Sequence, residues 1–483
     1  MTIVAALVAF GLIAVVAIRA FGLQRSVIVF GLTCIVVRPV NFIGFGTAST
    51  MSHTTIAAGR VSISTHDVAL LFVAVFAGLS VLRRFRLEFL IVAVASLSIA
   101  VLQSNLKPWV AEGILQWVFL GVCWAFGSAV SRAVSSGRLS ERFVAGTLLL
   151  CVGLHALAAC AQFAGFGRVY ESTLAGGDLS RMTGLAGHPG NLGKIILLLM
   201  MLILPLSSST DRTVRRLAWT ALGLSLTTEA LTFSRANVLA TAVLFLGWMI
   251  FNRRSSTINR AAILASATVA AIPVVQILIE RQQYDPDGGL RPALMKSAMI
   301  QLHETFWWGI GPNNYIEKVG QFDPYAAGGL PVHSTFVLML VELGAIVAVV
   351  AAIPFVLIII RAVRTAHANR GHAYAVGFLL SLPGLVIIMQ TGHGMTSEVV
   401  APTFFFAIGF IWSSLPDTNR AATESGDADS HTWDSLGDAA HPGDTQGAGN
   451  EPPSRLAHHS THSADKRDRV LENSPAHPLG HQR

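Results

Sequence analysis

The sequence predicts an all-α polytopic membrane protein with about 12–13 transmembrane helices, one long extracytoplasmic loop that contains short helices, and a disordered C-terminal tail. Two observations support this prediction. The 483 residues are 52% hydrophobic and only 13% charged, with a mean hydropathy of +0.58, whereas soluble domains have about 25% charged residues. The basic residues also gather in alternate connecting segments, as they do in polytopic membrane proteins.

Long apolar runs define the predicted helices. About 20 mostly apolar residues cross the hydrocarbon core, and about 17 suffice where the bilayer thins. Thirteen runs approach this length: 2–18, 26–45, 66–82, 88–103, 114–131, 143–163, 190–207, 217–233, 236–251, 261–279, 334–360, 372–390 and 398–414. The apolar stretch 217–251 is interrupted only by the segment 234–237, which contains polar residues. It is therefore either two short helices or one helix with a re-entrant break.

The distribution of basic residues predicts the orientation. Six short segments hold 17 arginines: Arg19, Arg25, Arg83, Arg84, Arg86, Arg132, Arg138, Arg142, Arg212, Arg215, Arg216, Arg253, Arg254, Arg260, Arg361, Arg364 and Arg370. The positive-inside rule places these segments in the cytoplasm. The C-terminus is then cytoplasmic, and we expect a multi-pass protein of the cell inner (plasma) membrane.

The chain is predicted to have three regions. Residues 1–139 form N-terminal transmembrane helices, residues 140–415 form a transmembrane core that includes the extracytoplasmic loop 281–333, and residues 416–483 form a disordered cytoplasmic tail. The tail holds 6 basic and 11 acidic residues and too few large aliphatic side chains to bury a core. Its seven histidines leave metal binding open, although their spacing is irregular.

Eleven basic residues lie outside both the cytoplasmic segments and the tail: Arg38, Arg60, Lys107, Arg168, Arg181, Lys194, Arg235, Arg281, Arg291, Lys296 and Lys318. They oppose the positive-inside rule and need another explanation. Four outer stretches combine Gly, Pro or Ser with a cation or a histidine at the edge of a predicted helix. These stretches are 181–194, 232–237, 291–314 and 332–344.

In their order and spacing, these four stretches resemble the O-antigen ligase and O-antigen polymerase family of integral membrane proteins. The resemblance covers residues 140–415. It implies a GT-C-like architecture and a glycosyltransferase that takes a glycan from an undecaprenyl-diphosphate-type lipid donor. The glycan would pass to a glycan, lipid or protein acceptor at the extracytoplasmic face. The expected partners are thus this polyprenyl-diphosphate-linked donor, the acceptor and membrane lipid, with no nucleic acid.

Four cations are the candidate ligands of the diphosphate, because guanidinium groups bind phosphates through charge-assisted hydrogen bonds. Arg235 lies in the break between two predicted spans, where an arginine needs an anionic partner; lipid phosphate or Glu229 are the alternatives to the donor. The resemblance implies the same binding role for Arg181 and Arg291. Lys194 is either a further phosphate contact or an interfacial anchor.

His333 is the candidate catalytic residue. It stands where the long loop meets the next predicted helix, and a neutral imidazole can accept a proton from an attacking sugar hydroxyl. The alternative is that this segment only caps the helix, through Ser334 and Thr335. The resemblance implies activation of the acceptor by this histidine, and in-line attack would invert the anomeric configuration.

We expect no metal and no cofactor, because three arginines can neutralise the leaving diphosphate. Asp285 and Asp287 have the spacing of a metal-binding pair, but their setting is typical of a solvated turn. Glu342, nine residues beyond His333, would lie about 13.5 Å further along the helix, where a carboxylate must be paired or protonated.

Two alternatives stay open at this stage. The motifs do not separate a ligase, which passes a finished glycan to a different acceptor, from a polymerase, which extends a lipid-linked chain. A transporter for an anion or another solute could use the same outer arginines as a selectivity cluster.

Overall fold

The computed structural model describes residues 18–20, 22–38, 41–45, 61–64, 108–167, 170–174, 177–251, 275–276, 279, 283, 289–369 and 371–416. Contacts divide the chain into two units, Met1–Pro416 and Asp417–Arg483, and every described residue lies in the first. The predicted spans 66–82 and 88–103, the pair Asp285 and Asp287, and the predicted tail from residue 417 onward lie outside the described residues.

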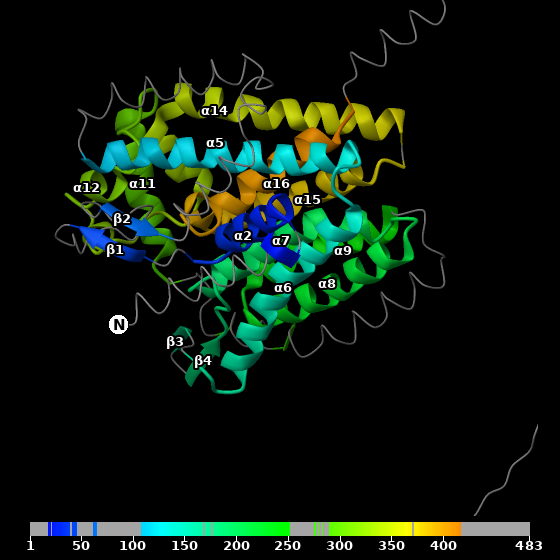
Figure 1. Ribbon diagram of the computed structural model, residues 1–483. Coiled ribbons are helices and arrows are strands. Elements are labelled where there is room, and N and C mark those ends of the chain that lie inside the picture. Colours follow the sequence, from blue (N-terminus) through cyan, green and yellow to red (C-terminus); the bar gives the residue numbers. More distant parts are fainter. Residues whose placement is uncertain are drawn as a thin grey trace, which may run out of the picture. The chain divides into compact units, whose positions relative to one another are not determined.

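The described part of the chain is mostly helical, as predicted (Figure 1). Its helices are α2 (Leu23–Val36), α5 (Pro108–Ser135), α6 (Glu141–Phe163), α7 (Pro189–Leu206), α8 (Arg212–Leu231), α9 (Arg235–Phe251), α11 (Arg291–Thr305), α12 (Tyr315–Val319), α13 (Pro324–Ala327), α14 (Thr335–Ala368), α15 (Ala373–Gln390), η1 (His393–Thr396) and α16 (Ala401–Ser414). Four of them, α6, α7, α14 and α15, are long and apolar enough to cross a membrane, and α2, α9 and α16 are shorter apolar helices.

Two short antiparallel hairpins depart from the all-α prediction. They pair β1 (Asn41–Phe45) with β2 (Val61–Ser64), and β3 (Tyr170–Leu174) with β4 (Gly177–Arg181). Neither hairpin produces a strong sequence signal, because each strand has only four or five residues. The second hairpin carries a candidate site residue, since its last residue is Arg181.

The first hairpin also corrects the predicted span 26–45. The helix ends at Val36 and a strand begins at Asn41. Pro39 explains the change, because proline disfavours the helical conformation of the residue before it and cannot donate a backbone hydrogen bond.

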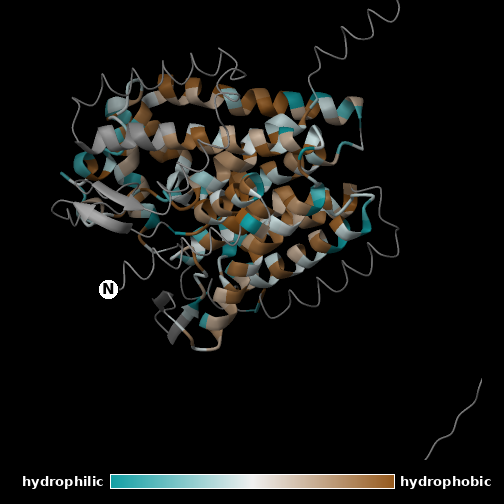
Figure 2. Cartoon of the chain, viewed as in Figure 1, coloured by the Kyte–Doolittle hydropathy of each residue, from teal (hydrophilic) through white to brown (hydrophobic). Residues whose placement is uncertain are grey.

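Helix α7 forms the centre of the core. Every residue from Leu192 to Leu206 is buried, and α7 packs against α6, α8, α9, α15 and α16. A helix that is apolar on all sides is stable only when it is surrounded, and hydrophobic residues dominate the helices around it (Figure 2). Segments distant in the sequence complete the packing, since α16 lies along α5 (Figure 1).

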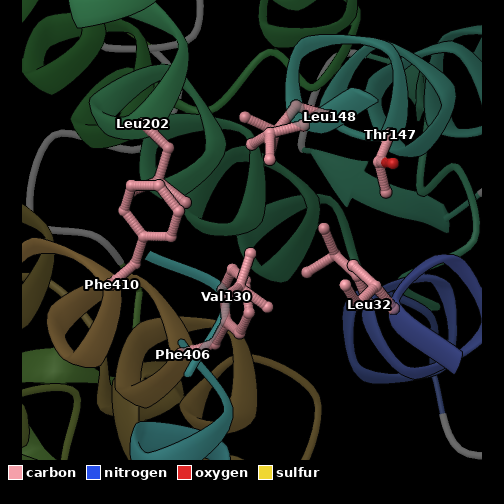
Figure 3. Close-up of a pocket in the computed structure, with 9 residues that line it drawn as sticks. Leu32, Val130, Thr147, Leu148, Leu202, Phe406 and Phe410 are labelled. Carbon is pink, nitrogen blue, oxygen red and sulfur yellow. The ribbon is translucent and has the colours of Figure 1, made fainter. Parts of the chain in front are cut away.

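A small apolar gap remains where α2, α5, α6, α7 and α16 meet. Its lining includes Leu32, Val130, Leu148 and Phe406 (Figure 3). Thr147 is the one polar residue of the lining, and its hydroxyl donates to the Phe143 carbonyl of its own helix. The gap therefore offers no group that could orient a charged or sugar substrate.

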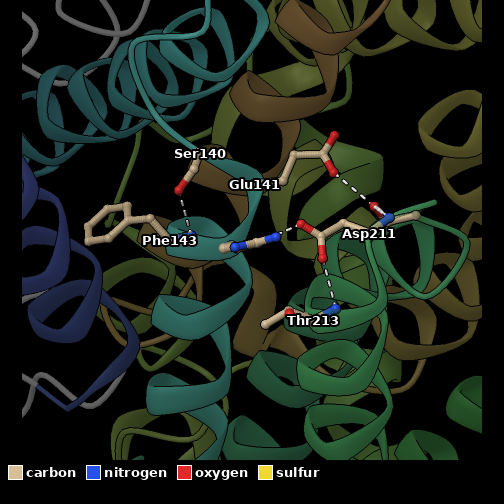
Figure 4. Close-up of polar contacts among 7 residues, drawn as sticks. Ser140, Glu141, Phe143, Asp211 and Thr213 are labelled. Carbon is tan, nitrogen blue, oxygen red and sulfur yellow. Dashed lines mark hydrogen bonds and ion pairs between the residues drawn. The ribbon is translucent and has the colours of Figure 1, made fainter.

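Arginine-rich segments that were predicted to be cytoplasmic meet at one end of the helices. Arg142 Nε donates to Asp211 Oδ2 at 2.6 Å, and Ser209 Oγ donates to Glu141 Oε2 at 3.0 Å (Figure 4). Helix α16 ends at the same place, where the Arg361 guanidinium donates to the carbonyl oxygens of residues 415 and 416. We call this end the basic end; it agrees with the predicted alternation of cations.

The outer loop folds on a small core of its own. Helix α11 begins at Arg291 with proline in its first turn, and it is one of the short helices predicted for the loop. Buried Leu294, Ala298 and Leu302 on one face of α11 turn inward, and the last two pack with Tyr315 of α12. The loop is thus a structured platform against the first turns of α14, which belongs to the same cluster.

Two glycines fix the loop against α14. Gly344 interrupts the helix with φ of 71°, and Gly309 faces it with φ of 69°. Between them, Ile310 N donates to the Val341 carbonyl at 3.0 Å. The Glu342 carboxylate accepts a hydrogen bond from Tyr315 N at 3.3 Å. A backbone amide of the loop is therefore a partner of this half-buried acid, which supports a structural role.

We expect Gly344→Ala to destabilise this junction by at least about 1 kcal/mol, because alanine is strained at positive φ and its Cβ would lie 2.4 Å from the Trp308 carbonyl carbon. Thermal unfolding of the detergent-solubilised protein, followed by tryptophan fluorescence, measures the effect. Gly223→Ala is the matched control, since a Cβ there meets nothing within 4 Å. Equal unfolding temperatures for the two variants would contradict the prediction.

Candidate functional site

The helix ends opposite the basic end carry the candidate residues. Arg181 ends strand β4 and is buried, with 7% of its surface exposed. Its Nε donates to the Thr232 carbonyl at 3.0 Å, and Met182 N donates to the Leu231 carbonyl at 3.2 Å. Both acceptors lie at the C-terminal end of α8, whose last carbonyls have no partner within the helix. The hairpin therefore presents Arg181 at the end of the α8 helix.

His188 caps the N-terminus of α7. Its Nδ1 accepts a hydrogen bond from Gly190 N at 3.0 Å. The residue is exposed at the surface, but partial desolvation by the surrounding protein lowers its pKa to about 4, helped by the charges of Arg181, Lys194 and His333. The structure gives this histidine a capping role, within range of the charges of three candidate residues.

Lys194 lies in the second turn of α7 and is buried, with 6% of its surface exposed. The backbone of the connection between α15 and α16 curls around its ammonium group. A Cβ on Gly394 would lie 2.4 Å from Lys194 Nζ, and a Cβ on Gly392 would lie 3.0 Å from it. An interfacial anchor would reach into the lipid headgroups. This lysine instead ends inside the protein.

The break between α8 and α9 makes them two helices rather than one. Helix α8 ends at Leu231, Phe233 has φ of 47°, and α9 begins at Arg235. Asn237, in the first turn of α9, donates through Nδ2 to the Gly190 carbonyl at 3.0 Å. This bond brings the start of α9, and with it the backbone of Arg235, beside the start of α7.

The structure argues against the pairing of Arg235 with Glu229. Glu229 is buried with 2% of its surface exposed, and neither carboxylate oxygen has a hydrogen-bond partner among the described residues. Its side chain points to α7 instead, where a Cβ on Gly193 would lie 2.7 Å from Oε1.

His333 lies just before α14, whose N-cap is Ser334. The Ser334 hydroxyl accepts from Val337 N at 3.4 Å, and the Thr335 hydroxyl donates to the Gly392 carbonyl at 2.8 Å. Capping is therefore done by the residue after His333. The His333 Nδ1 is buried and has no hydrogen-bond partner within the described structure.

Neighbouring cations act on His333. Burial lowers its pKa to about 4, and the charges of Arg291 and Lys194 contribute, while a hydrogen bond to the Pro331 carbonyl opposes the shift. The positive charge of Arg291, the first residue of α11, also influences Lys194. The first helix of the long outer loop therefore lies within electrostatic range of His333, at the other end of the loop.

His393 belongs to the same group, and the sequence analysis missed it. Its ring lies edge to face with that of His333, with centroids 5.2 Å apart and an interplanar angle of 89°. Burial lowers the pKa of His393 to about 3, and the charges of Lys194, His333 and His188 lower it further. The sequence Gly392–Gly394, a histidine between two glycines at the end of a predicted span, was the available signal.

These residues form one group, which we call the cationic cluster: Arg181, His188, Lys194, Arg291, His333 and His393. Two arginines, a lysine and three imidazoles of lowered pKa suit an anionic ligand. Arg235 adjoins the cluster through the α8–α9 break. Across the described residues, no group of three or more His, Cys, Asp or Glu side chains is placed to hold a metal ion.

The fold is that of a helical, membrane-type protein, and the cationic cluster lies at one end of its helices. A family model described as O-antigen ligase matches residues 220–352. The match supports an O-antigen ligase-like family, as the resemblance predicted. A search of the curated proteins found no match.

The matched region contains Arg235, Arg291 and His333, whereas Arg181, Lys194 and His393 lie outside it. Together with the apolar helices, the match supports a membrane protein of polysaccharide biosynthesis with glycosyltransferase-like chemistry. The ligase family implies a lipid-linked glycan donor and an acceptor.

Proposed function

We propose that the protein is a metal-independent, inverting glycosyltransferase. It transfers or polymerises a glycan from an undecaprenyl-diphosphate-type donor onto an acceptor. The observation that carries this proposal is the cationic cluster, which gathers around His333 within and beside the region of the family match. The arginine-rich basic end lies at the other end of the helices, so the positive-inside rule assigns the cluster to the extracytoplasmic face of the inner membrane.

The cations of the cluster bind the diphosphate. Arg181, Lys194 and Arg291 come from a hairpin, a transmembrane helix and the outer loop, so they can surround a headgroup on several sides. Arg235 adds a fourth charge at the α8–α9 break. In a desolvated site, such groups stabilise the negative charge that develops on the leaving diphosphate. Lys194 lies one turn inside α7, at the depth suited to a headgroup whose polyprenyl chain stays in the bilayer.

His333 activates the acceptor. The acceptor hydroxyl oxygen attacks the anomeric carbon, and its proton passes to Nδ1 of His333. The bond between that carbon and the diphosphate oxygen breaks, and its electron pair leaves with the diphosphate. Because a single displacement occurs, the anomeric configuration inverts. The bound diphosphate also offsets the charges of Arg291 and Lys194, which makes His333 a stronger base when the donor is present.

The acid limb of the pH profile tests this role. Because the His333 pKa is about 4 in the free protein, protonation of this residue should leave kcat/KM unchanged down to about pH 4. Below that pH, kcat/KM should fall because the protonated ring can no longer accept the proton of the acceptor hydroxyl. Arg291→Ala removes a positive charge, raises this pKa and moves the limb to higher pH. A limb near pH 6.5 in both proteins would contradict the assignment.

Reconstitution tests the function as a whole. The full-length protein in lipid nanodiscs receives a synthetic undecaprenyl-diphosphate glycan and a candidate acceptor, and the product is followed with and without EDTA. We expect transfer that is insensitive to EDTA, with an inverted linkage by NMR. A retained linkage excludes the single displacement, and loss of activity in EDTA excludes the metal-free mechanism. The length of the product distinguishes polymerisation from transfer of a finished glycan.

Anion transport, the alternative, has less structural support. Below Lys194, helix α7 continues as buried apolar residues from Ile195 to Leu204, and a transport path needs polar groups at that depth. Uptake of labelled phosphate into proteoliposomes without any glycan product would favour the transporter.

A further inference from the structure

We propose that His393 is a further ligand of the donor diphosphate, and that it acts together with Lys194. This inference rests on the proposed function. His333 then serves the acceptor side of the reaction, while His393 donates a hydrogen bond to a phosphoryl oxygen of the leaving group.

The segment that carries His393 is held firmly. It lies in η1 between α15 and α16. The Thr335 hydroxyl binds the Gly392 carbonyl at 2.8 Å on one side. On the other side, the Ser397 hydroxyl donates a hydrogen bond to the Gly394 carbonyl at 2.6 Å, and the Thr396 hydroxyl donates one to the His393 carbonyl at 2.9 Å. A residue fixed in this way can present its side chain at a constant position.

The His393 side chain is aimed into the cluster with an unused polar atom. Its ring meets that of His333 edge to face, and its Nδ1 is buried without a hydrogen-bond partner in the described structure. A buried polar atom without a partner is costly. A ligand that supplies the missing hydrogen-bond partner removes this cost. The Nδ1 of His333 is likewise buried without a partner among the described residues.

The surroundings specify the charge of that ligand. The glycines on either side of His393 both border Lys194 Nζ, so the ammonium lies against the segment that carries the imidazole. Every group whose charge acts on His393 is a lysine or another histidine. An ammonium and an N–H donor that share one site can both be satisfied by phosphoryl oxygens. The leaving diphosphate is the anion that the proposed reaction supplies.

The position of Lys194 can be changed without removing its charge. A Cβ on Gly394 would lie 2.4 Å from Nζ and 2.7 Å from Asn191 Oδ1. Gly394→Ala therefore displaces the flexible end of Lys194 from the site that it shares with His393. It should reproduce the binding defect of His393→Ala if the two side chains bind the ligand together.

Binding measurements on the full-length protein in nanodiscs test the inference, with undecaprenyl diphosphate as the probe and inorganic pyrophosphate as a competitor for the headgroup. We expect His393→Ala and Gly394→Ala each to weaken binding about tenfold or more. His393→Gln, which keeps an N–H donor, should recover part of the affinity. His303→Ala, an exposed histidine of α11, is the matched control and should bind as the wild type does. In the transfer assay, KM for the donor should rise while KM for the acceptor stays unchanged.

Three outcomes overturn the inference. Wild-type affinity in His393→Ala, or a change confined to the acceptor KM, removes His393 from the diphosphate site while leaving the proposed function intact. Equal losses in His393→Gln and His393→Ala show that the ring acts through packing rather than as a donor. A wild-type protein that neither binds undecaprenyl diphosphate nor transfers a glycan contradicts the proposed function itself.

Discussion

Replacing His333 with alanine is expected to lower the rate of glycan transfer by about 10²–10⁴-fold, the range that a general base contributes. The affinity for the donor should change little, because the cations of the cluster remain. The expectation rests on the buried, unpartnered Nδ1 of His333 and on the charges of Arg291 and Lys194 that act on the ring. Single-turnover transfer from the lipid-linked donor, measured at saturating acceptor, reports the chemical step.

Ser334→Ala is the matched control for this experiment. It removes the hydroxyl that caps α14 and costs about 1 kcal/mol of stability, but it leaves the imidazole in place. If Ser334→Ala lowers transfer as much as His333→Ala does, the segment acts by shaping the helix start. Full transfer by His333→Ala would exclude the base altogether.

Replacing Arg291 with alanine is expected to lower the rate by about 10²–10³-fold, which is typical for the loss of one group that stabilises developing charge. Arg291→Lys should recover only part of the rate, because an ammonium cannot make the two parallel hydrogen bonds of a guanidinium. The rate of the chemical step and the KM for the donor should both be measured, since the guanidinium is proposed to bind the diphosphate before and during its departure.

The variant Lys296→Ala distinguishes a specific contact of Arg291 from a general effect of positive charge on α11. Lys296 is an exposed cation on this same helix. Its replacement should change the rate of transfer little, and any change should become smaller at higher salt. Equal losses in the two variants would mean that α11 contributes only a positive surface.

The cluster combines matched and unmatched parts of the chain. The family match ends at residue 352 and begins at residue 220, so it contains the outer loop and both sides of the α8–α9 break. The segment 181–194 and η1 complete the cluster from outside it. If the predictions for His393 and Lys194 hold, residues outside the matched region contribute to the binding of the leaving group.

The sequence determined the class of the protein because membrane helices are local. Each span must satisfy its own backbone hydrogen bonds and cover its own length of hydrocarbon, so an apolar run predicts a helix without knowledge of its neighbours. The ends of α6, α7, α8 and α15 fall within a few residues of the predicted spans.

Pairings between distant segments were decided by the tertiary structure. Hairpins β1–β2 and β3–β4 depend on contacts between short strands, and the Gly344 kink depends on the backbone of residues 306–311 packing against it. His393 was missed for the same reason. A histidine between two glycines in a short connection is a weak signal, and only the folded chain places it against His333.

The sequence by itself therefore determined the apolar, helical character of the chain and the approximate bounds of its described helices, because composition and periodicity act within a single segment. The four cations and one histidine proposed to act on the donor and acceptor were selected by their place at predicted helix edges together with the family resemblance. Only the tertiary structure decided that Lys194 is enclosed by the glycines around His393 and that Glu229 does not pair with Arg235. Both depend on side chains from separate helices meeting inside the packed protein, which no local pattern specifies.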